Sequence, residues 1–455
     1  MTDILDLPDW NVLTSRLDDG TYTIEAEYTQ PLQACTKCGV VGKLYRHGPK
    51  VVTYRDSPIR GAHVQLAAKV QRYKCRECGG TSLQPLGGIA SDMRMTTRCV
   101  DYIERQCMRD TFTRIADYVG CDEKTVRNVA MAYVDKFNAS YRPVVPEWLG
   151  IDETRLAGQL RCVLTDVVSR RPVDILPADD SKTIAQWLHS HQAAKVVRGV
   201  ASDLRASFHK VIREMLPGVP VVADKFHVVR MADDALDTTR RRIGKSNGKE
   251  YNLGLKRSKH LVKKRAHNLS EKQVFNRDIW LDNEPHLDQA YRLKEELYNL
   301  YEQPASKAEA YFDDWLARAS SCDAKADFRK LVGTLKRYRT LILAYFKYPI
   351  TNGYTESFNG DTKAMARAGR GYMFEVIRVR ALTKPPPKRM KPIILPVSMI
   401  FRMDGPSIHW QMKEKMLRFT LADGRCESCH GAFEIDDLAV IDGCLICRTC
   451  STRTH

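Results

Sequence analysis

The stretch from Trp148 to Pro177 constrains the fold more than any other part of this sequence. It contains three short runs of apolar and β-branched residues separated by turn-prone residues, a pattern typical of adjacent β-strands. The first run leads into an acidic residue, Asp152, within the sequence GIDE. The stretch therefore predicts a three-stranded antiparallel meander with a carboxylate on its first strand.

The residues after this stretch alternate between helical and strand-like patterns. A helix is predicted first, followed by a strand over 194–203 that ends at Asp203. An amphipathic helix comes next, and a fifth strand over 219–223 ends at Asp224. Three antiparallel strands followed by two strands that alternate with helices are the order expected of an RNase-H-like sheet.

The charge of the chain favours a polyanionic partner. Its 455 residues include 72 Lys and Arg against 55 Asp and Glu, a formal net charge of +17. Nucleic acid is the simplest partner for such a surplus of positive charge. The alternative is an ordinary basic protein whose charges are scattered over its surface. No apolar run is long enough for a membrane helix. Because the acidic N-terminus lacks the features of a secretion signal, we expect a cytoplasmic location and no membrane partner.

Eight of the fourteen cysteines occur in Cys-x-x-Cys pairs. Two such pairs can complete a tetrahedral zinc site, and a cytosolic chain makes metal a better interpretation than disulfides. A redox dithiol and unpaired core thiols are the alternatives. We therefore predict two structural zinc ions. The predicted ligands are Cys35, Cys38, Cys75 and Cys78 in one site and Cys426, Cys429, Cys447 and Cys450 in the other.

Residues 96–138 have the pattern of a helix-turn-helix. Gly120 falls at the turn between two helical segments, and Asp122 is suited to cap the second. Residues near the start of such a second helix contact base edges in DNA, whereas a plain helical hairpin is the alternative. The candidate DNA-binding residues are Thr125, Arg127 and Asn128 here, and Lys363, Arg367 and Arg370 on or just past a later helix.

Three acidic residues are candidates for a catalytic metal site. Phosphodiester cleavage needs a strong nucleophile and relief of charge on the leaving oxygen, and two Mg²⁺ or Mn²⁺ ions held by carboxylates can supply both. Asp152 would bridge the ions, and Asp203 and Glu356 would each hold one. On pattern alone the competing acids are Glu153, Asp166 and Asp174 for the first position and Asp224 for the second.

Several segments together resemble the bacterial insertion-sequence transposases of the ISL3 family: GIDETR, LTDVVSRRPVDILPADDSKTIAQWL, GVASDLRASFHKVIREMLPGVPVVADKFHVV and NGYTESFNGDTKAMARAGRGY. The resemblance spans about residues 35–380. It implies an RNase-H-like core with a DDE triad and a helical insertion before the last acid. Carried over by position, the triad is Asp152, Asp203 and Glu356. The DKFHV motif adds Asp224 and His227 as secondary candidates.

The resemblance also implies an activity. It is that of a DNA transposase, which binds the terminal inverted repeats of its element and joins their strands to target DNA with Mg²⁺ or Mn²⁺. The partner would be double-stranded DNA at the bacterial nucleoid. Because the element has two ends and each would need its own chain, we expect a homo-oligomer, at least a dimer. The alternatives are a domesticated transposase that binds DNA as a regulator without catalysis, and a nuclease that cuts without joining.

The whole sequence thus predicts a multidomain α+β chain. The predicted domains are a zinc-binding β-rich domain (1–90), a helix-turn-helix (91–140), the first part of an RNase-H-like α/β catalytic core (147–232), an all-helical basic insertion (233–345), the final core helix with Glu356 (346–383), and a linker with a C-terminal zinc-binding module (384–455).

Overall fold

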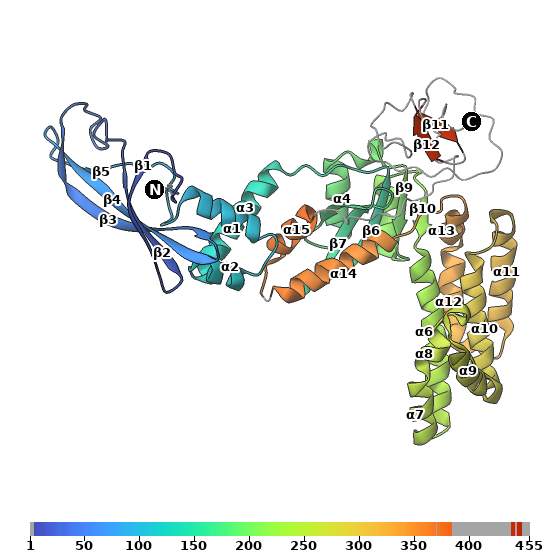
Figure 1. Ribbon diagram of the computed structural model, residues 1–455. Coiled ribbons are helices and arrows are strands. Elements are labelled where there is room, and N and C mark those ends of the chain that lie inside the picture. The colour runs from blue at the N-terminus through green and yellow to red at the C-terminus, as the bar shows by residue number, and fades with distance from the viewer. Residues whose placement is uncertain (1–3, 370, 385–437, 442–443, 448–455) are drawn as a thin grey trace. The chain divides into compact units, whose positions relative to one another are not determined.

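A computed structural model describes residues 4–369, 371–384, 438–441 and 444–447 of the chain (Figure 1). By their internal contacts the described residues form two compact units. The first contains the residues up to 142 together with those of 364–384, and the second contains 143–363. The long helix α14 (Gly353–Ala368) belongs to the second unit as far as Lys363 and to the first over its last turn. None of the described helices combines the length and apolar character needed to span a bilayer.

The first unit begins with a five-stranded sheet of order β1-β2-β4-β3, with β5 paired to β4. Strands β2 and β4 are parallel, and the other pairs are antiparallel. Apolar side chains of β2 and β4, among them Ile24, Val64 and Leu66, are fully buried and form the core of this sheet. The strands are β1 (Trp10–Asp18), β2 (Thr21–Tyr28), β3 (Leu44–Ile59), β4 (Ala62–Cys75) and β5 (Thr81–Leu83).

Three helices follow the sheet: α1 (Thr97–Gln106), α2 (Phe112–Val119) and α3 (Glu123–Ser140). Asp122 caps α3 by accepting a hydrogen bond from the Thr125 amide, and Gly120 ends α2 with a φ of 71°, as the sequence predicted. The buried carboxylate of Asp56 on β3 accepts hydrogen bonds from Thr96 and Arg98. These bonds fix the sheet to α1, so the sheet and the helices form one unit.

The helix α15 (Phe374–Thr383) also belongs to this first unit, whereas we predicted from the sequence that residues 346–383 belong to the catalytic core. Its Arg380 is 5% exposed and donates through Nε to the carbonyl oxygen of Cys107, 2.5 Å away. The same guanidinium lies over the ring of Tyr372. The contact with Cys107 joins residues 273 positions apart in the sequence, so no local pattern could have revealed it.

The second unit is built on a sheet of order β10-β9-β6-β7-β8. Strands β6, β7 and β8 form the predicted antiparallel meander, with a tight turn at Ala157-Gly158 where both residues have positive φ. Strands β9 and β10 run parallel to β6 and to each other. The strands are β6 (Trp148–Leu156), β7 (Gln159–Asp166), β8 (Arg171–Ile175), β9 (Gly199–Ser202) and β10 (Val221–Ala223).

The two faces of this sheet pack against different groups of residues. Leu149, Ile151 and Leu164 face α4 (Ser181–Ser190) and α5 (Ala206–Met215) in one apolar cluster. A smaller cluster on the other face includes Trp148, Val222 and Ile350. Ile350 lies just before α14 in the sequence. Strand β9 ends at Ser202, opposite Ile151 in the middle of β6.

A helical insertion separates β10 from α14. It begins at Lys225, eight residues before the predicted start at 233, because the Asp224 carboxylate caps the helix there. Side chains such as Leu293, Phe312 and Trp315 form its buried core. The helices are α6 (Lys225–Ser246), α7 (Lys249–Arg257), α8 (Lys259–Lys263), α9 (Glu271–Asn283), α10 (Pro285–Leu300), α11 (Ala305–Ser321), α12 (Lys325–Arg337) and α13 (Arg339–Leu343) (Figure 1).

Beyond residue 384 the structure describes a short antiparallel hairpin of β11 (Leu438–Ile441) and β12 (Cys444–Cys447). The second predicted zinc site falls on this part of the chain. Cys426, Cys429 and Cys450 lie outside the described residues, and of Cys447 only the backbone is described. The second zinc site therefore stays a prediction from the sequence.

Candidate active site and metal centre

The register of the second sheet brings two of the three predicted acids together. Strand β9 runs parallel to β6 with Ile151 opposite Ser202. The next residues along the chain are Asp152, in the middle of β6, and Asp203, directly after the end of β9, so the register places the two acids side by side. Glu356 lies in the first turn of α14, and its charge and that of Asp203 act on Asp152.

The carboxylate of Asp152 is 7% exposed and is held on both oxygens. Its Oδ1 accepts a hydrogen bond of 2.7 Å from the Glu153 amide, and its Oδ2 accepts one of 2.7 Å from Nδ2 of Asn359. Burial and the neighbouring charges of Asp203 and Glu356 raise the pKa of Asp152 to about 7. The site therefore concentrates negative charge, which a bound cation would relieve.

Asp203 and Glu356 are more accessible, with side chains 22% and 34% exposed. Oδ2 of Asp203 lies 3.1 Å from Nδ1 of His227, and this hydrogen bond raises the pKa of His227. Oε1 of Glu356 accepts a hydrogen bond of 3.0 Å from Arg230. His227 and Arg230 both lie on the first turns of α6, so this helix supplies a partner to each of the two accessible acids.

Asp224 differs from Asp203 in exposure and in partners. Its side chain is fully buried, and burial raises its pKa to about 6. One oxygen accepts from the amide of His227 and the other from the amide of Asn352, at 3.3 and 3.0 Å. Asp224 therefore joins the start of α6 to the start of α14 and keeps both oxygens on backbone N–H groups.

The three acids that compete with Asp152 on sequence pattern are engaged elsewhere. Asp166 accepts from two backbone amides in the turn after β7. Asp174 accepts from the Trp187 indole, and Glu153 forms an ion pair with Arg205. These contacts account for the positions of the three side chains without a metal. Asp152, in contrast, is influenced by the charges of the Asp203 and Glu356 carboxylates.

Close packing of α14 on β6 brings Glu356 to this cluster. A Cβ atom added to Gly150 would lie 2.7 Å from Oγ1 of Thr355, so only glycine permits this approach. Thr355 also hydrogen-bonds Thr165. Asn352 donates from its side chain to the carbonyl oxygen of Ile151, 2.9 Å away. Sequence reasoning missed Gly150 and Asn352, although the spacing of Asn352, Glu356 and Asn359 places them on one helix face.

Without a bound cation, we expect Asp152→Asn to raise the thermal midpoint of the protein at pH 8. Since the folded pKa of Asp152 is raised from 3.8 to about 7, its contribution to stability is fully present below about pH 4 and is lost as the pH rises through 7. One pKa unit is worth about 1.4 kcal/mol, which limits the effect to about 4 kcal/mol.

Thermal unfolding of both proteins at pH 5 and pH 8, without added divalent ions, measures this effect. The gain in the variant should grow between the two pH values, because the unaltered carboxyl is protonated at the lower one. An equal gain in thermal midpoint at both pH values would contradict the raised pKa of Asp152.

The four cysteines of the first unit form a metal-binding cluster. Sγ of Cys35 lies 3.7 Å from that of Cys78, and Sγ of Cys38 lies 3.8 Å from that of Cys75. A tetrahedral zinc with bonds of about 2.3 Å separates its sulfurs by roughly 3.8 Å, so the spacing fits this ion. In the described part of the chain, no other three or more Cys, His, Asp or Glu have ligand atoms this close together.

The two halves of this cluster have the same local structure. The amides of Lys37 and Glu77 approach Sγ of Cys35 and Cys75 at 3.5 and 3.4 Å. Donation from backbone amides lowers the pKa of Cys35 to about 6 and favours the thiolate that binds metal. Both Cys-x-x-Cys pairs are thus shaped as metal knuckles.

The predicted DNA-binding residues differ in their surroundings. Arg127 and Asn128 are exposed on the first turns of α3, and Arg127 forms an ion pair with Glu123 at 2.6 Å. Thr125 is half-buried and takes part in the Asp122 cap. On α14, Lys363 is half-buried and Arg367 is exposed. Arg370 lies outside the described residues.

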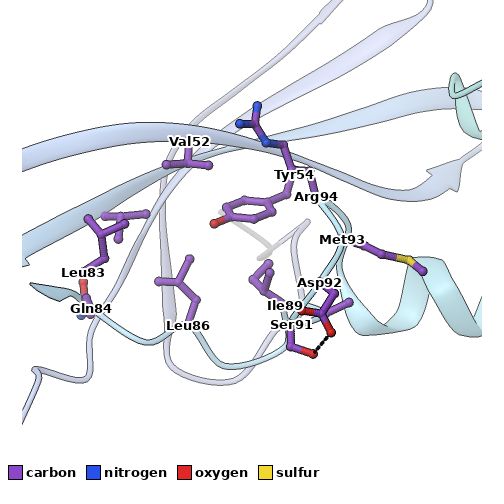
Figure 2. A pocket seen from close by; sticks show the side chains of 12 residues that line it. Val52, Tyr54, Leu83, Gln84, Leu86, Ile89, Ser91, Asp92, Met93 and Arg94 are labelled. Atoms are coloured by element: carbon purple, nitrogen blue, oxygen red, sulfur yellow. Dashed lines mark hydrogen bonds between the residues drawn. The ribbon is translucent and has the colours of Figure 1, made fainter. Parts of the chain in front are cut away.

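A cavity of about 430 Å³ lies in the first unit, away from the acids and the thiolates. Figure 2 shows Val52 and Tyr54 of β3 on one side and Leu86 and Ile89 on the other. Arg94 is the one basic residue in its lining, and Asp92 the one acid. The lining holds neither a carboxylate cluster nor a set of metal ligands, so it is no candidate for the catalytic centre.

Comparison with known proteins identifies the class to which this fold and these two sites belong. Residues 149–381 match the ISL3 transposase family model, and residues 31–78 match the zinc-finger of transposases IS204, IS1001, IS1096 and IS1165. The chain is thus an insertion-sequence transposase by family. Within that class it belongs to the ISL3 family, as the sequence predicted.

Two relatives span most of the chain. The transposase for insertion sequence element IS1001 of Bordetella parapertussis is 26% identical over 368 residues, which cover 77% of this chain and 88% of the relative. The transposase for insertion sequence element IS1557 of Mycobacterium tuberculosis is 25% identical over 370 residues, with coverage of 75% and 83%. Both alignments are long enough to include more than the catalytic domain.

Proposed function

We propose that this chain is a DDE-type DNA transposase that binds the terminal inverted repeats of its own insertion sequence, cuts there and joins the strands to target DNA. Asp152, Asp203 and Glu356 are the catalytic acids. The observation that carries the proposal is that β9 pairs with β6 so that Asp203 lies beside Asp152, while the Glu356 charge also acts on Asp152, within the segment that matches the ISL3 transposase model. The relatives' names, transposases for IS1001 and IS1557, agree with it.

The catalytic core is proposed to be RNase-H-like. In support, a meander of three antiparallel strands is followed by two strands parallel to the first, in the order β10-β9-β6-β7-β8. In this arrangement the first acid lies on the central strand and the second follows its parallel neighbour. The helical insertion between β10 and α14 separates the second acid from the third along the chain.

The acidic site is proposed to hold Mg²⁺ or Mn²⁺. Carboxylate oxygens are the ligands that these cations prefer. Burial and, after it, the negative charges of Asp203 and Glu356 raise the pKa of Asp152, and a bound cation would relieve both effects. When bound, two such ions activate a nucleophile and relieve charge on the leaving oxygen. The charges of the other two acids both act on Asp152, which would contact both ions, while Asp203 and Glu356 would each contact one.

The residues around the acids are proposed to orient them. His227 holds one oxygen of Asp203 and leaves the other oxygen of that carboxylate for the cation. Arg230, whose side chain is 62% exposed, pairs with Glu356 and can also reach toward a phosphate of a bound strand. Asp224 acts through the backbone of α6 and α14 and touches neither cation nor DNA.

The first unit is proposed to recognise the ends of the element. Exposed Arg127 and Asn128 at the start of α3 suit contact with base edges, and Thr125 lies beside them. Lys363, Arg367 and Arg370 on or just past α14 are proposed to contact phosphates. Two ends must be processed together, so at least two copies of the chain act on double-stranded DNA, at the nucleoid of a bacterial cytoplasm.

A cleavage and joining assay tests this function. The full-length protein is incubated with a labelled duplex that carries the element's own end and flanking DNA, a target plasmid and Mg²⁺. We expect cuts at the boundary of the element and joined products that link the labelled end to the plasmid. Tight end binding without cutting would favour a DNA-binding regulator, and cutting without joined products would favour a nuclease.

A further inference from the structure

Asn359 is a polar residue whose side chain contacts the acidic cluster. Asn359 is 4% exposed, a degree of burial that an amide side chain adopts only at a cost unless its polar atoms find partners. Its Nδ2 donates to Oδ2 of Asp152 at 2.7 Å, across 207 positions of sequence. Its Oδ1 has no hydrogen-bond partner among the described residues.

The position of Asn359 on α14 links it to the third acid. It lies three residues after Glu356, on the same face of the helix, because residues three or four apart are neighbours on a helix surface. The start of that helix is fixed to the core by two contacts of Asn352: its amide donates to Asp224, and its side chain donates to Ile151. A single anchored helix thus presents one catalytic carboxylate and an amide that holds another.

The surroundings of Asp152 explain why such an amide is needed. Its nearest charged neighbours are the acids Asp203, Glu356 and Asp224. Of its two oxygens, Oδ1 is held by the amide of the next residue, and Oδ2 by Asn359. Without the hydrogen bond from Asn359, the buried Oδ2 would have no donor and would be repelled by the neighbouring carboxylates. We expect it to turn away from its present position.

We propose that Asn359 is a positioning residue that holds the Asp152 carboxylate at a fixed orientation to Glu356. This inference rests on the proposed function, since it assigns Asn359 to the same catalytic site. The unpartnered Oδ1 lies in the same buried side chain and is an oxygen suited to bind Mg²⁺ or to accept a hydrogen bond from one of its ligand waters. Partners that orient metal ligands typically contribute about 10- to 100-fold to metal affinity or activity.

The test uses two substitutions in the full-length protein. Asn359→Asp has the same shape but turns the donor into an acceptor that faces Oδ2 of Asp152, and Asn359→Ser keeps a short donor. Ser357→Ala, at an exposed position of the same helix, is the matched control. Three quantities are measured: kcat for end cleavage, KM for the end duplex, and the Mg²⁺ concentration at half-maximal rate.

We expect Asn359→Asp to lower kcat by about 10- to 100-fold and to raise the half-maximal Mg²⁺ concentration, with KM for DNA unchanged. Asn359→Ser should recover part of the loss, and Ser357→Ala should match the unaltered protein. A general folding defect would instead lower the fraction of active protein, and would leave the Mg²⁺ dependence of the remainder unchanged. Wild-type kcat and Mg²⁺ dependence in Asn359→Asp would overturn the proposal.

A second readout keeps this inference separate from the proposed function. Mn²⁺ binding to the full-length protein, followed by electron paramagnetic resonance, requires no DNA and no cleavage. Binding should weaken in Asn359→Asp and be lost in Asp203→Ala. If the unaltered protein binds Mn²⁺ in this way but cuts no end duplex, the transposase proposal fails while the role of Asn359 stands. Unchanged Mn²⁺ binding in Asn359→Asp would contradict that role.

Discussion

Replacing Asp152, Asp203 or Glu356 by alanine is expected to reduce end cleavage by on the order of a thousandfold or more, because each change removes a carboxylate that would hold a catalytic cation. Loss of several kcal/mol of charge stabilisation in the transition state has an effect of that size. Binding of the end duplex should change little, since the candidate base-contacting residues lie on α3. Cleavage rates and duplex affinity, measured on the same preparations, check both statements.

Asp166→Asn is the matched control for these three variants. Asp166 is an acid of the same sheet, but its Oδ1 accepts from the amides of Val168 and Ser169 at 2.9 Å. Asparagine keeps an acceptor oxygen, so the turn and the activity should both survive. If Asp166→Asn abolished cutting, or if any one of the three alanine variants cut normally, the proposed triad would be wrong.

Variants of Asp224 and Asp203 distinguish an acid with a structural role from one with a proposed catalytic role. Both of its oxygens accept from backbone amides, so Asp224→Asn replaces one acceptor by a donor that faces an N–H group. We expect this variant to lose thermal stability together with activity. Asp203→Asn should lose activity alone, because the Asp203 side chain is partly exposed and its hydrogen-bond partner is His227. Thermal midpoints beside cleavage rates distinguish the two acids.

Replacing Cys35 and Cys38 by serine is expected to remove one zinc ion per chain and to unfold the part of the first sheet next to the cluster. The first half of β3, from Tyr45 to Val51, is exposed along its whole length. The apolar core of the sheet lies at the other end, around Ile24, Val64 and Leu66. None of the side chains of β3 over these residues is buried, so we expect metal binding to supply much of the free energy that holds this strand near the knuckles.

Hydrogen exchange and zinc analysis test this expectation. In the double serine variant, amide protection should fall over residues 43–51 and 71–83 and persist over 64–68. Cys121→Ser is the control, because this thiol lies in the same unit outside the cluster. Zinc content should fall from two ions per chain to one, and a Cys426→Ser, Cys429→Ser variant should lose the other. Full protection of the β3 amides without metal would show that the ion is dispensable for this strand.

The sequence by itself determined those parts of the protein that depend on neighbours along the chain. Alternation of apolar residues and the Ala157-Gly158 turn specify the meander that carries Asp152. The Asp122 cap and Gly120 specify the α2–α3 pair. The spacing within each Cys-x-x-Cys pair specifies a metal knuckle. Each of these signals acts over a few residues, where periodicity, capping and turn geometry leave few alternatives.

The choice among acids is less local. The sequence pattern alone left Asp166, Asp174 and Glu153 open beside Asp152, and Asp224 beside Asp203, and the resemblance to ISL3 transposases ranked them without a physical reason. The structure offers a physical reason for the proposed choice. Parallel pairing of β9 with β6 places Asp203 beside Asp152, and backbone amides occupy both oxygens of Asp224.

Only the tertiary structure decided how the third acid meets the other two. Gly150 lets α14 approach β6, Asn352 fixes the start of that helix, and Asn359 holds Asp152. The partners of these contacts lie about 200 positions apart in the sequence. Contacts across that distance depend on which elements pack together and in what register. A local pattern contains no information on either, because the same glycine or asparagine fits many helices and strands equally well.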